Sequence, residues 1–219
     1  MPWTFHRSAN AVARLAILGG VAVVCGASLV AGAIWRSPYV TEEGVVREQP
    51  VPFSHEHHVS GLGIDCRYCH ATVERAAFAG MPATETCMKC HSVMWTDSPM
   101  LEPVRESYRT GERLVWTRVN NLPQFVYFDH SVHVTRGVGC SSCHGRVDRM
   151  PLTYQAAPLT MEWCLSCHTN PAANLRPRDQ VFRMDWTPPA DQEARGAALA
   201  AEYRTPSVRE LTSCSTCHR

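Results

Sequence analysis

Apolar residues are concentrated near the N-terminus of the chain. Residues 15–35 read LAILGGVAVVCGASLVAGAIW and contain no charged side chain. About 20 such residues are enough for a helix that crosses a bilayer. His6, Arg7 and Arg14 precede the run, and the positive-inside rule places a flank of this kind in the cytoplasm. The pattern predicts a cytoplasmic tail and transmembrane anchor helix over residues 1–35, with the rest of the chain on the outer face of the membrane.

A cleaved secretory signal is the alternative, because Ala31-Gly32-Ala33 resembles a cleavage site. The apolar run exceeds the roughly 7 to 15 residues of a signal core, which favours a retained, single-pass anchor. Cys25 follows Val24 rather than a small residue, which disfavours lipid attachment. We expect Cys25 to be a small apolar side chain packed in the membrane.

Beyond the anchor, hydrophobic periodicity is weak and short. Residues 36–52 carry three prolines and mixed charge, as a linker does. Residues 100–111 predict a short helix, broken or shifted by an internal proline. Residues 114–128 predict extended chain. Residues 169–189 are expected to wrap the surface, and residues 191–203 to form a surface helix weakened by its central glycine.

The pattern Cys-x-x-Cys-His occurs five times and changes this picture. Two thiols three positions apart can form thioethers to both vinyl groups of one porphyrin, and the next histidine then lies under the iron as its proximal ligand. The chain has 219 residues and 11 cysteines, of which only Cys25 lies outside the motifs. The predicted haem-binding cysteines are Cys66, Cys69, Cys87, Cys90, Cys140, Cys143, Cys164, Cys167, Cys214 and Cys217. The predicted proximal iron ligands are His70, His91, His144, His168 and His218.

Zinc sites and disulfides are the two alternatives for so many cysteines. Structural zinc sites combine two such half-motifs, and five intact motifs do not divide evenly in that way. A disulfide framework gives no reason for a histidine after every second cysteine. The sequence therefore predicts five covalently bound haem c groups.

Composition sets the fold class. Only 45% of the residues are hydrophobic, and many of those lie in the anchor, so the haems themselves must supply much of the core. We predict a multihaem cytochrome c that is organised by its haems, with little regular secondary structure beyond short helices and loops, plus one N-terminal transmembrane helix. The formal net charge of +1 gives no sign of nucleic-acid binding.

An internal repeat divides the outer part of the chain. The stretch 53–59 (FSHEHHV) and the stretch 128–134 (FDHSVHV) are each followed by a pair of glycines and two motifs. Self-similarity of this kind indicates a duplicated unit. The predicted divisions are a linker at 36–52, a first two-haem unit with its connector at 53–127, a second two-haem unit at 128–170, and a C-terminal wrap with the fifth motif at 171–219.

Each copy of the repeat brings two further histidines. Imidazole is a common axial ligand of haem iron, so His55, His58, His130 and His133 are predicted to be distal ligands. His57 has no counterpart in the second copy, where Val132 stands, and it is expected to lie at the surface or behind a ligand.

Four distal histidines leave one of five irons without a predicted partner. Met150 and Met161 are candidates, since a thioether ligand raises the haem potential; His57 or an open position are the others. Pentahaem nitrite reductases carry a lysine in the catalytic motif, and no Cys-x-x-Cys-Lys occurs here. The pattern predicts an electron carrier with no catalytic residues of its own.

Three stretches together resemble the pentahaem cytochrome c subunit of alternative complex III: FSHEHHVSGLGIDCRYCHATVE, LPQFVYFDHSVHVTRGVGCSSCHGRVDRMPLTYQAAPLTMEWCLSCHTNP and the terminal CSTCHR. The paired-haem units also resemble small class III cytochromes. That second resemblance implies that His55 and His130 each ligate the haem of the motif that follows. His58 and His133 would reach to other haems.

The resemblance to alternative complex III implies a subunit of a bacterial membrane complex that oxidises quinol. Its partners would be an iron–sulfur subunit related to molybdopterin enzymes, multi-helix quinol-binding subunits and a monohaem cytochrome c. Two other functions compete: a stand-alone membrane-anchored quinol dehydrogenase that feeds a periplasmic reductase, and a small-molecule reductase with a vacant iron. The fifth motif counts against the first, and the paired histidines count against the second.

Overall fold

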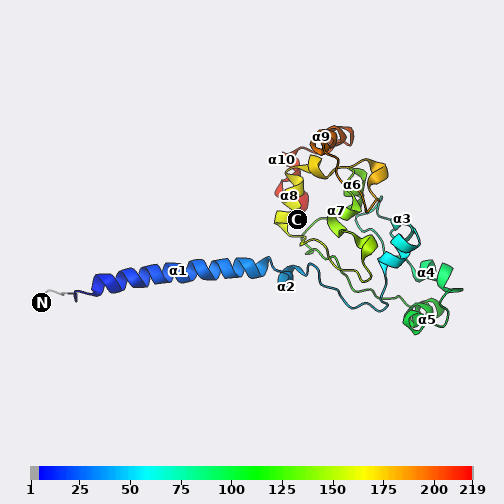
Figure 1. The fold of residues 1–219 in the computed structure, drawn as a ribbon, viewed down its shortest axis with the longest axis horizontal. Coiled ribbons are helices and arrows are strands. Elements are labelled where there is room, and N and C mark those ends of the chain that lie inside the picture. Colours follow the sequence, from blue (N-terminus) through cyan, green and yellow to red (C-terminus); the bar gives the residue numbers. More distant parts are fainter. Residues whose placement is uncertain (1–4, 219) are drawn as a thin grey trace. The chain divides into compact units, whose positions relative to one another are not determined.

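The computed structural model describes residues 5–218. Residues 1–4, at the start of the predicted cytoplasmic tail, and Arg219 lie outside the described residues. The chain divides into two compact units, at residues 1–42 and 43–219 (Figure 1). Each unit is described by itself.

The N-terminal unit is dominated by one long helix. Helix α1 spans Ala9–Trp35, and the short helix α2 spans Pro38–Thr41. In the described part of the chain, α1 is the one helix that is long and apolar enough to cross a membrane, with a mean hydropathy of 2.3. Its apolar side chains are exposed along its length, Leu15 by 72% and Leu29 by 75%. The predicted apolar anchor is therefore a single continuous helix.

The second unit is built from short helices joined by loops. Its α-helices are α3 (Cys66–Cys69), α4 (Thr84–His91), α5 (Glu102–Thr110), α6 (His130–Thr135), α7 (Cys140–His144), α8 (Met161–His168), α9 (Gln192–Glu202), α10 (Val208–Leu211) and α11 (Cys214–Cys217). Single turns of other helix types are η1 (Glu56–Gly61), a π-helix, and the 3₁₀ turns η2 (Pro99–Leu101), η3 (Val147–Arg149), η4 (Pro171–Asn174) and η5 (Arg178–Gln180).

No strand forms within residues 5–218, and the extended segments meet only at isolated bridges. Glu43 pairs with Gln155, and Val126 pairs with His218. The predicted extended stretch 114–128 is thus extended chain outside any sheet. The prediction of a fold with little regular secondary structure is confirmed.

The polypeptide core is small and divided. One cluster joins Val51, Leu101 and Val104, and a second joins Val73, Val134 and Val181. Burial of apolar surface is the main contribution to the stability of a fold. Two clusters of three buried residues each bury little apolar surface. The expectation that bound haems complete the core fits this arrangement.

Two local predictions are sharpened by packing. Pro103 lies in the first turn of α5, where its missing N–H costs nothing; it therefore starts this helix and does not break it. Gly111 ends the helix with φ +74°, a conformation that glycine adopts without strain.

The segment expected to wrap the surface also reaches inward. Leu175 and Val181 are the most deeply buried large side chains among the described residues, at 2% and 1% exposure. Helix α9 packs on η4 through Gly196, where an added Cβ would lie 1.8 Å from the carbonyl oxygen of Ala172. The glycine that was expected to weaken this helix is the residue that lets the two backbones meet.

Candidate haem sites

Each Cys-x-x-Cys-His motif lies on a helical turn, on α3, α4, α7, α8 and α11 in chain order. Residues three apart share one face of a helix, so the two cysteines of each motif point the same way and the histidine follows at or just past the helix end. Side chains cap two of these turns: Asp65 accepts a hydrogen bond from the Arg67 amide, and Thr160 from the Trp163 amide. The local sequence therefore presents two thiols and an imidazole together.

No disulfide joins the cysteines within residues 5–218. All eleven lie within the described residues as free thiols, so the disulfide alternative finds no support. No group of three or more His, Cys, Asp or Glu side chains in the described part of the chain gathers as a metal-ion site.

Three predicted distal histidines face the histidine of a motif at a distance that fits an iron between them. Two imidazoles that ligate one metal from opposite sides, each nitrogen about 2 Å from it, have ring centres about 6 Å apart. The ring centres of His130 and His144 are 6.2 Å apart with an interplanar angle of 6°. Those of His133 and His168 are 6.2 Å apart at 25°, and those of His58 and His91 are 6.3 Å apart at 64°.

His55 lies near His70 of the first motif. Burial and, next, the nearby His70 together lower the pKa of His55 to about 4. Burial likewise lowers the pKa of His144 to about 4, followed by the effects of His130 and His70. These imidazoles are therefore neutral at pH 7, which is the form that binds a metal.

Hydrogen bonds orient the rings. The Nδ1 atoms of several histidines donate to backbone carbonyl oxygens: His58 to Ser54 (2.8 Å), His70 to Gly80 (2.8 Å), His91 to Met94 (3.2 Å), His130 to Ala77 (2.8 Å), His133 to Asp129 (2.7 Å) and His168 to Leu211 (2.9 Å). A carbonyl oxygen only accepts, so Nδ1 carries the proton and Nε2 keeps the free lone pair. Ligands of metals are held in this way in proteins, and these residues fit bis-histidine haem sites.

The repeat seen in the sequence is a repeat in space. The Phe53 ring stacks on His58 at 4.4 Å and meets His55 edge-on at 4.9 Å. In the second copy, Phe128 stacks on His133 at 4.7 Å and meets His130 edge-on at 4.7 Å. Sequence reasoning noted these phenylalanines only as the start of each repeat, yet each one supports both distal histidines of its copy.

The two copies also exchange contacts. His55 Nδ1 lies 2.9 Å from Thr153 Oγ1, between the motifs of the second copy. His130 bonds with both its ring and its backbone amide to the carbonyl of Ala77, between the motifs of the first copy. Thr153 and Ala77 could not be found from their residue types. They matter because each first histidine is positioned by the other copy.

Neighbouring motifs lie within electrostatic reach of one another. Burial raises the pKa of the Cys69, Cys140, Cys143 and Cys164 thiols, and the next cause in each case is a cysteine of another motif. Cys87 acts on Cys69, and Cys66 acts on Cys140. Cys167 acts on Cys143, and Cys217 on Cys164. The sites therefore form a row in the order second, first, third, fourth, fifth motif, which Figure 1 shows from α4 through α3 and α7 to α8 and the C-terminus.

The fifth site differs from the others. His218 pairs with Val126 at a backbone bridge, and its ring centre lies 5.8 Å from that of Phe125. Of its candidate distal ligands, Met150 is 2% exposed and lies beside Gly145, at the third motif. His57 contacts Trp95, just beyond the second motif, with ring centres 6.2 Å apart.

Met161 is the remaining methionine candidate. It is 65% exposed and begins α8, whose Cys164 lies near Cys217 of the fifth motif. Met161 therefore begins a helix that lies near the fifth motif, for which no distal histidine is predicted.

Comparison with known proteins decides the class. The model of the family "Class III cytochrome C family" matches residues 34–109, and that of "Cytochrome c7 and related cytochrome c" matches residues 126–219. The first match holds two motifs and the second holds three. The chain carries multihaem cytochrome c domains. Cytochromes of this type bind haem c covalently.

One curated relative is similar over part of this cytochrome. The menaquinone reductase multiheme cytochrome c subunit of Nitratidesulfovibrio vulgaris (strain Hildenborough) is 34% identical over 127 residues. The match covers 58% of this chain and 54% of the relative. The cytochrome thus spans about half the length of that relative.

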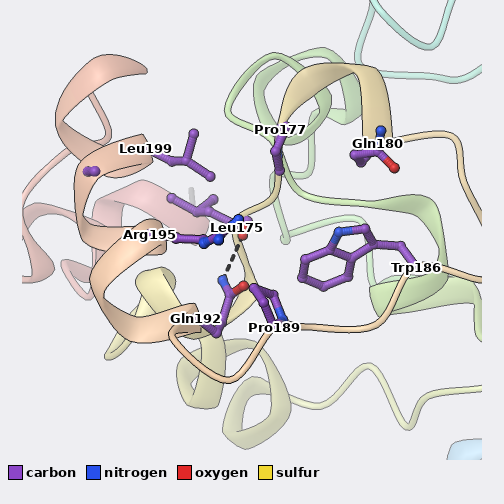
Figure 2. A pocket seen from close by; sticks show the side chains of 9 residues that line it. Leu175, Pro177, Gln180, Trp186, Pro189, Gln192, Arg195 and Leu199 are labelled. Carbon is purple, nitrogen blue, oxygen red and sulfur yellow. Dashed lines mark hydrogen bonds between the residues drawn. The ribbon is translucent and has the colours of Figure 1, made fainter.

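A pocket of about 400 Å³ lies away from the motifs, in the C-terminal segment. Figure 2 shows Leu175, Trp186 and Leu199 on its walls, with Gln192 bonded to the Leu175 carbonyl. Arg195, also on its wall, is paired with Asp191 at 2.8 Å. The pocket is mainly apolar, and Arg195 brings no unpaired charge to it because Asp191 pairs with it.

Proposed function

We propose that this cytochrome binds five haem c groups and passes electrons between a membrane quinone pool and an outer acceptor. Haem c supplies a one-electron couple. The observation that carries the proposal is the set of three facing imidazole pairs with ring centres 6.2 to 6.3 Å apart. Two strong ligands on each iron leave no place for substrate, so these sites favour electron transfer over substrate chemistry.

The assignment of ligands follows the repeat. His55 and His70 would serve the first site, His58 and His91 the second, His130 and His144 the third, and His133 and His168 the fourth. In each copy the first histidine serves the motif just after it, and the second serves the later motif of the same copy. For the fifth site, His218 is one ligand and Met161 is the distal candidate that its placement favours.

The row of sites implies a path for electrons. The second motif and the fifth motif lie at its two ends, and the first and third sites join the two copies in its middle. Electrons that enter at one end would leave at the other. A partner protein is therefore expected to dock near α4 and another near α11.

The resemblance to alternative complex III makes a quinol-oxidising complex the preferred setting. In that setting α1 anchors the cytochrome in the membrane with the haem domain on the periplasmic face. Its neighbours are an iron–sulfur subunit related to molybdopterin enzymes, multi-helix quinol-binding subunits and a monohaem cytochrome c. The cytochrome is then an electron-carrier subunit and the quinol chemistry belongs to its partners.

A second candidate rests on the relative from Nitratidesulfovibrio vulgaris, whose name describes menaquinone reduction. The same row of sites would then carry electrons towards the quinone pool. The direction of electron flow depends on the partners in the complex and on the reduction potentials of the sites, and both can be measured.

The test uses the membrane protein purified with its native partners. Mass spectrometry of the cytochrome should show five covalent haems, and substitution of Cys214 and Cys217 by serine should leave four. Menaquinol should reduce the haems of the intact complex, and an added acceptor should reoxidise them. Fewer than five haems on the native chain contradict the proposal. Rapid haem oxidation by menaquinone, with no reduction by menaquinol, favours the second candidate.

A further inference from the structure

Arg176 is a buried cation with no carboxylate partner among the described residues. It is 3% exposed, and its guanidinium lies over the Trp186 ring at 4.3 Å from the centroid. Its Nη atoms donate to the Ser141 and Ser142 hydroxyls and to the Arg183 carbonyl, while its Nε has no partner. A buried charge is costly unless it is paired, so a cation retained here needs a physical reason.

The position of Arg176 is specific to the third motif. Ser141 and Ser142 are the two residues between Cys140 and Cys143, so the guanidinium lies directly beside the turn to which the haem is attached. The residue before the motif makes room for it: a Cβ on Gly139 would lie 2.0 Å from the guanidinium carbon. Gly139 has an ordinary extended backbone, with φ −78°, so the glycine is needed for space.

The matching site of the first copy is built differently. Asp65 occupies the place of Gly139, with nearly the same backbone angles (φ −67°, ψ 142°). Asp65 pairs with Arg67 at 2.9 Å, and both side chains are about half exposed. The first motif therefore carries a solvated arginine that is paired with the carboxylates of Asp65 and, at 4.0 Å, Glu74, whereas the third carries one buried positive charge.

We propose that Arg176 raises the reduction potential of the haem at the third motif and so makes the two copies of the duplicated unit unequal. The inference rests on the proposed five-haem function. Reduction adds one electron, received from a neighbouring site, and lowers the charge on the iron by one. A fixed positive charge in a medium of low dielectric constant favours that state. Arg176 acts on the potential of this haem through its charge, and it is not a ligand of the iron.

The test is a redox titration of the purified holo-complex, followed by the low-spin signals in electron paramagnetic resonance. The signal of the third haem is identified as the low-spin signal that is lost in His130→Ala, since His130 faces His144 of the third motif. In Arg176→Gln, the ratio of reduced to oxidised third haem at a fixed potential should fall about tenfold, which equals about 59 mV for one electron. Arg67→Gln, in the solvated pair of the first copy, is the matched control and should leave this signal unshifted.

Haem counting by mass separates the outcomes. If Arg176→Gln retains five haems and the midpoint potential of the third haem is unshifted, the inference is overturned and the proposed function stands. A native chain without haem at the third motif overturns both. If Arg176→Gln does not retain five haems, Arg176→Lys decides. The ammonium keeps the charge but cannot make the guanidinium hydrogen bonds, so an unchanged midpoint supports the charge effect. Loss or shift of the haem in Arg176→Lys means a structural role alone and overturns the inference.

Discussion

His130 and His144 lie with their ring centres 6.2 Å apart and their planes only 6° apart, although they are separated by an entire loop in the sequence. The spacing fits one iron between two imidazoles, and the His130 ring is held by the Ala77 carbonyl of the other copy. The site therefore depends on both copies of the duplicated unit.

Replacement of His130 by alanine should turn one of the five haems high-spin, because His144 alone leaves an open axial position. One low-spin signal, that of the third haem, should disappear in electron paramagnetic resonance. Electron flow along the row should be interrupted, since the third site lies in its middle. His57→Ala is the control and should leave the spectra unchanged. Unaltered spectra in His130→Ala would show that His130 is not a ligand.

The contact between His55 and Thr153 should tune the first haem. A neutral His55 that ligates through Nε2 donates from Nδ1 to the Thr153 hydroxyl, which makes the imidazole a stronger donor to the iron. Thr153→Val should therefore raise the midpoint potential of one haem while all haems stay low-spin, as measured by redox titration. Thr169→Val, whose hydroxyl bonds to the Leu165 and Ser166 carbonyls of its own helix, should shift nothing. Equal shifts in the two variants would argue against this role.

Gly196 should resist replacement even though alanine favours helices. Intrinsic preference alone predicts a gain of about 1 kcal/mol for Gly196→Ala. The added Cβ would meet the Ala172 carbonyl at 1.8 Å, and overpacking of this kind costs about 1 to 3 kcal/mol. We expect a lower free energy of unfolding in chemical denaturation. Ala197→Gly, at an exposed position of α9, should lose only about 1 kcal/mol of helix preference. A stabilised Gly196→Ala protein would refute the close packing.

Charged residues within α1 should release the cytochrome from membranes. Lysine at the centre of a transmembrane helix costs about 2.5 to 3.5 kcal/mol, so Val23→Lys combined with Val24→Lys should move the protein from the membrane to the soluble fraction on ultracentrifugation. Tyr39→Lys, in α2 beyond the apolar run, is the control and should stay in the membrane fraction. Retention of the double variant in cells that lack the partner subunits would contradict an anchor formed by α1.

The sequence by itself determined those features that depend on neighbours along the chain. Cysteines three apart with a histidine next predict a haem attachment turn, an uncharged run of some twenty residues forms one long helix, and the scarcity of apolar residues predicts little regular secondary structure. The repeat also marked His55, His58, His130 and His133 as a set, because a duplicated pattern is visible without coordinates.

Only the tertiary structure decided which groups meet across long separations. It placed His58 opposite His91 and His133 opposite His168, and it set the motifs in a row that differs from their order along the chain. It brought Arg176 over the third motif and Gly196 against Ala172. These relationships arise from packing between segments that are tens of residues apart, and they cannot be predicted from residue type. An arginine in a proline-rich stretch, for example, is expected to be solvated, and only the fold shows that Arg176 is buried.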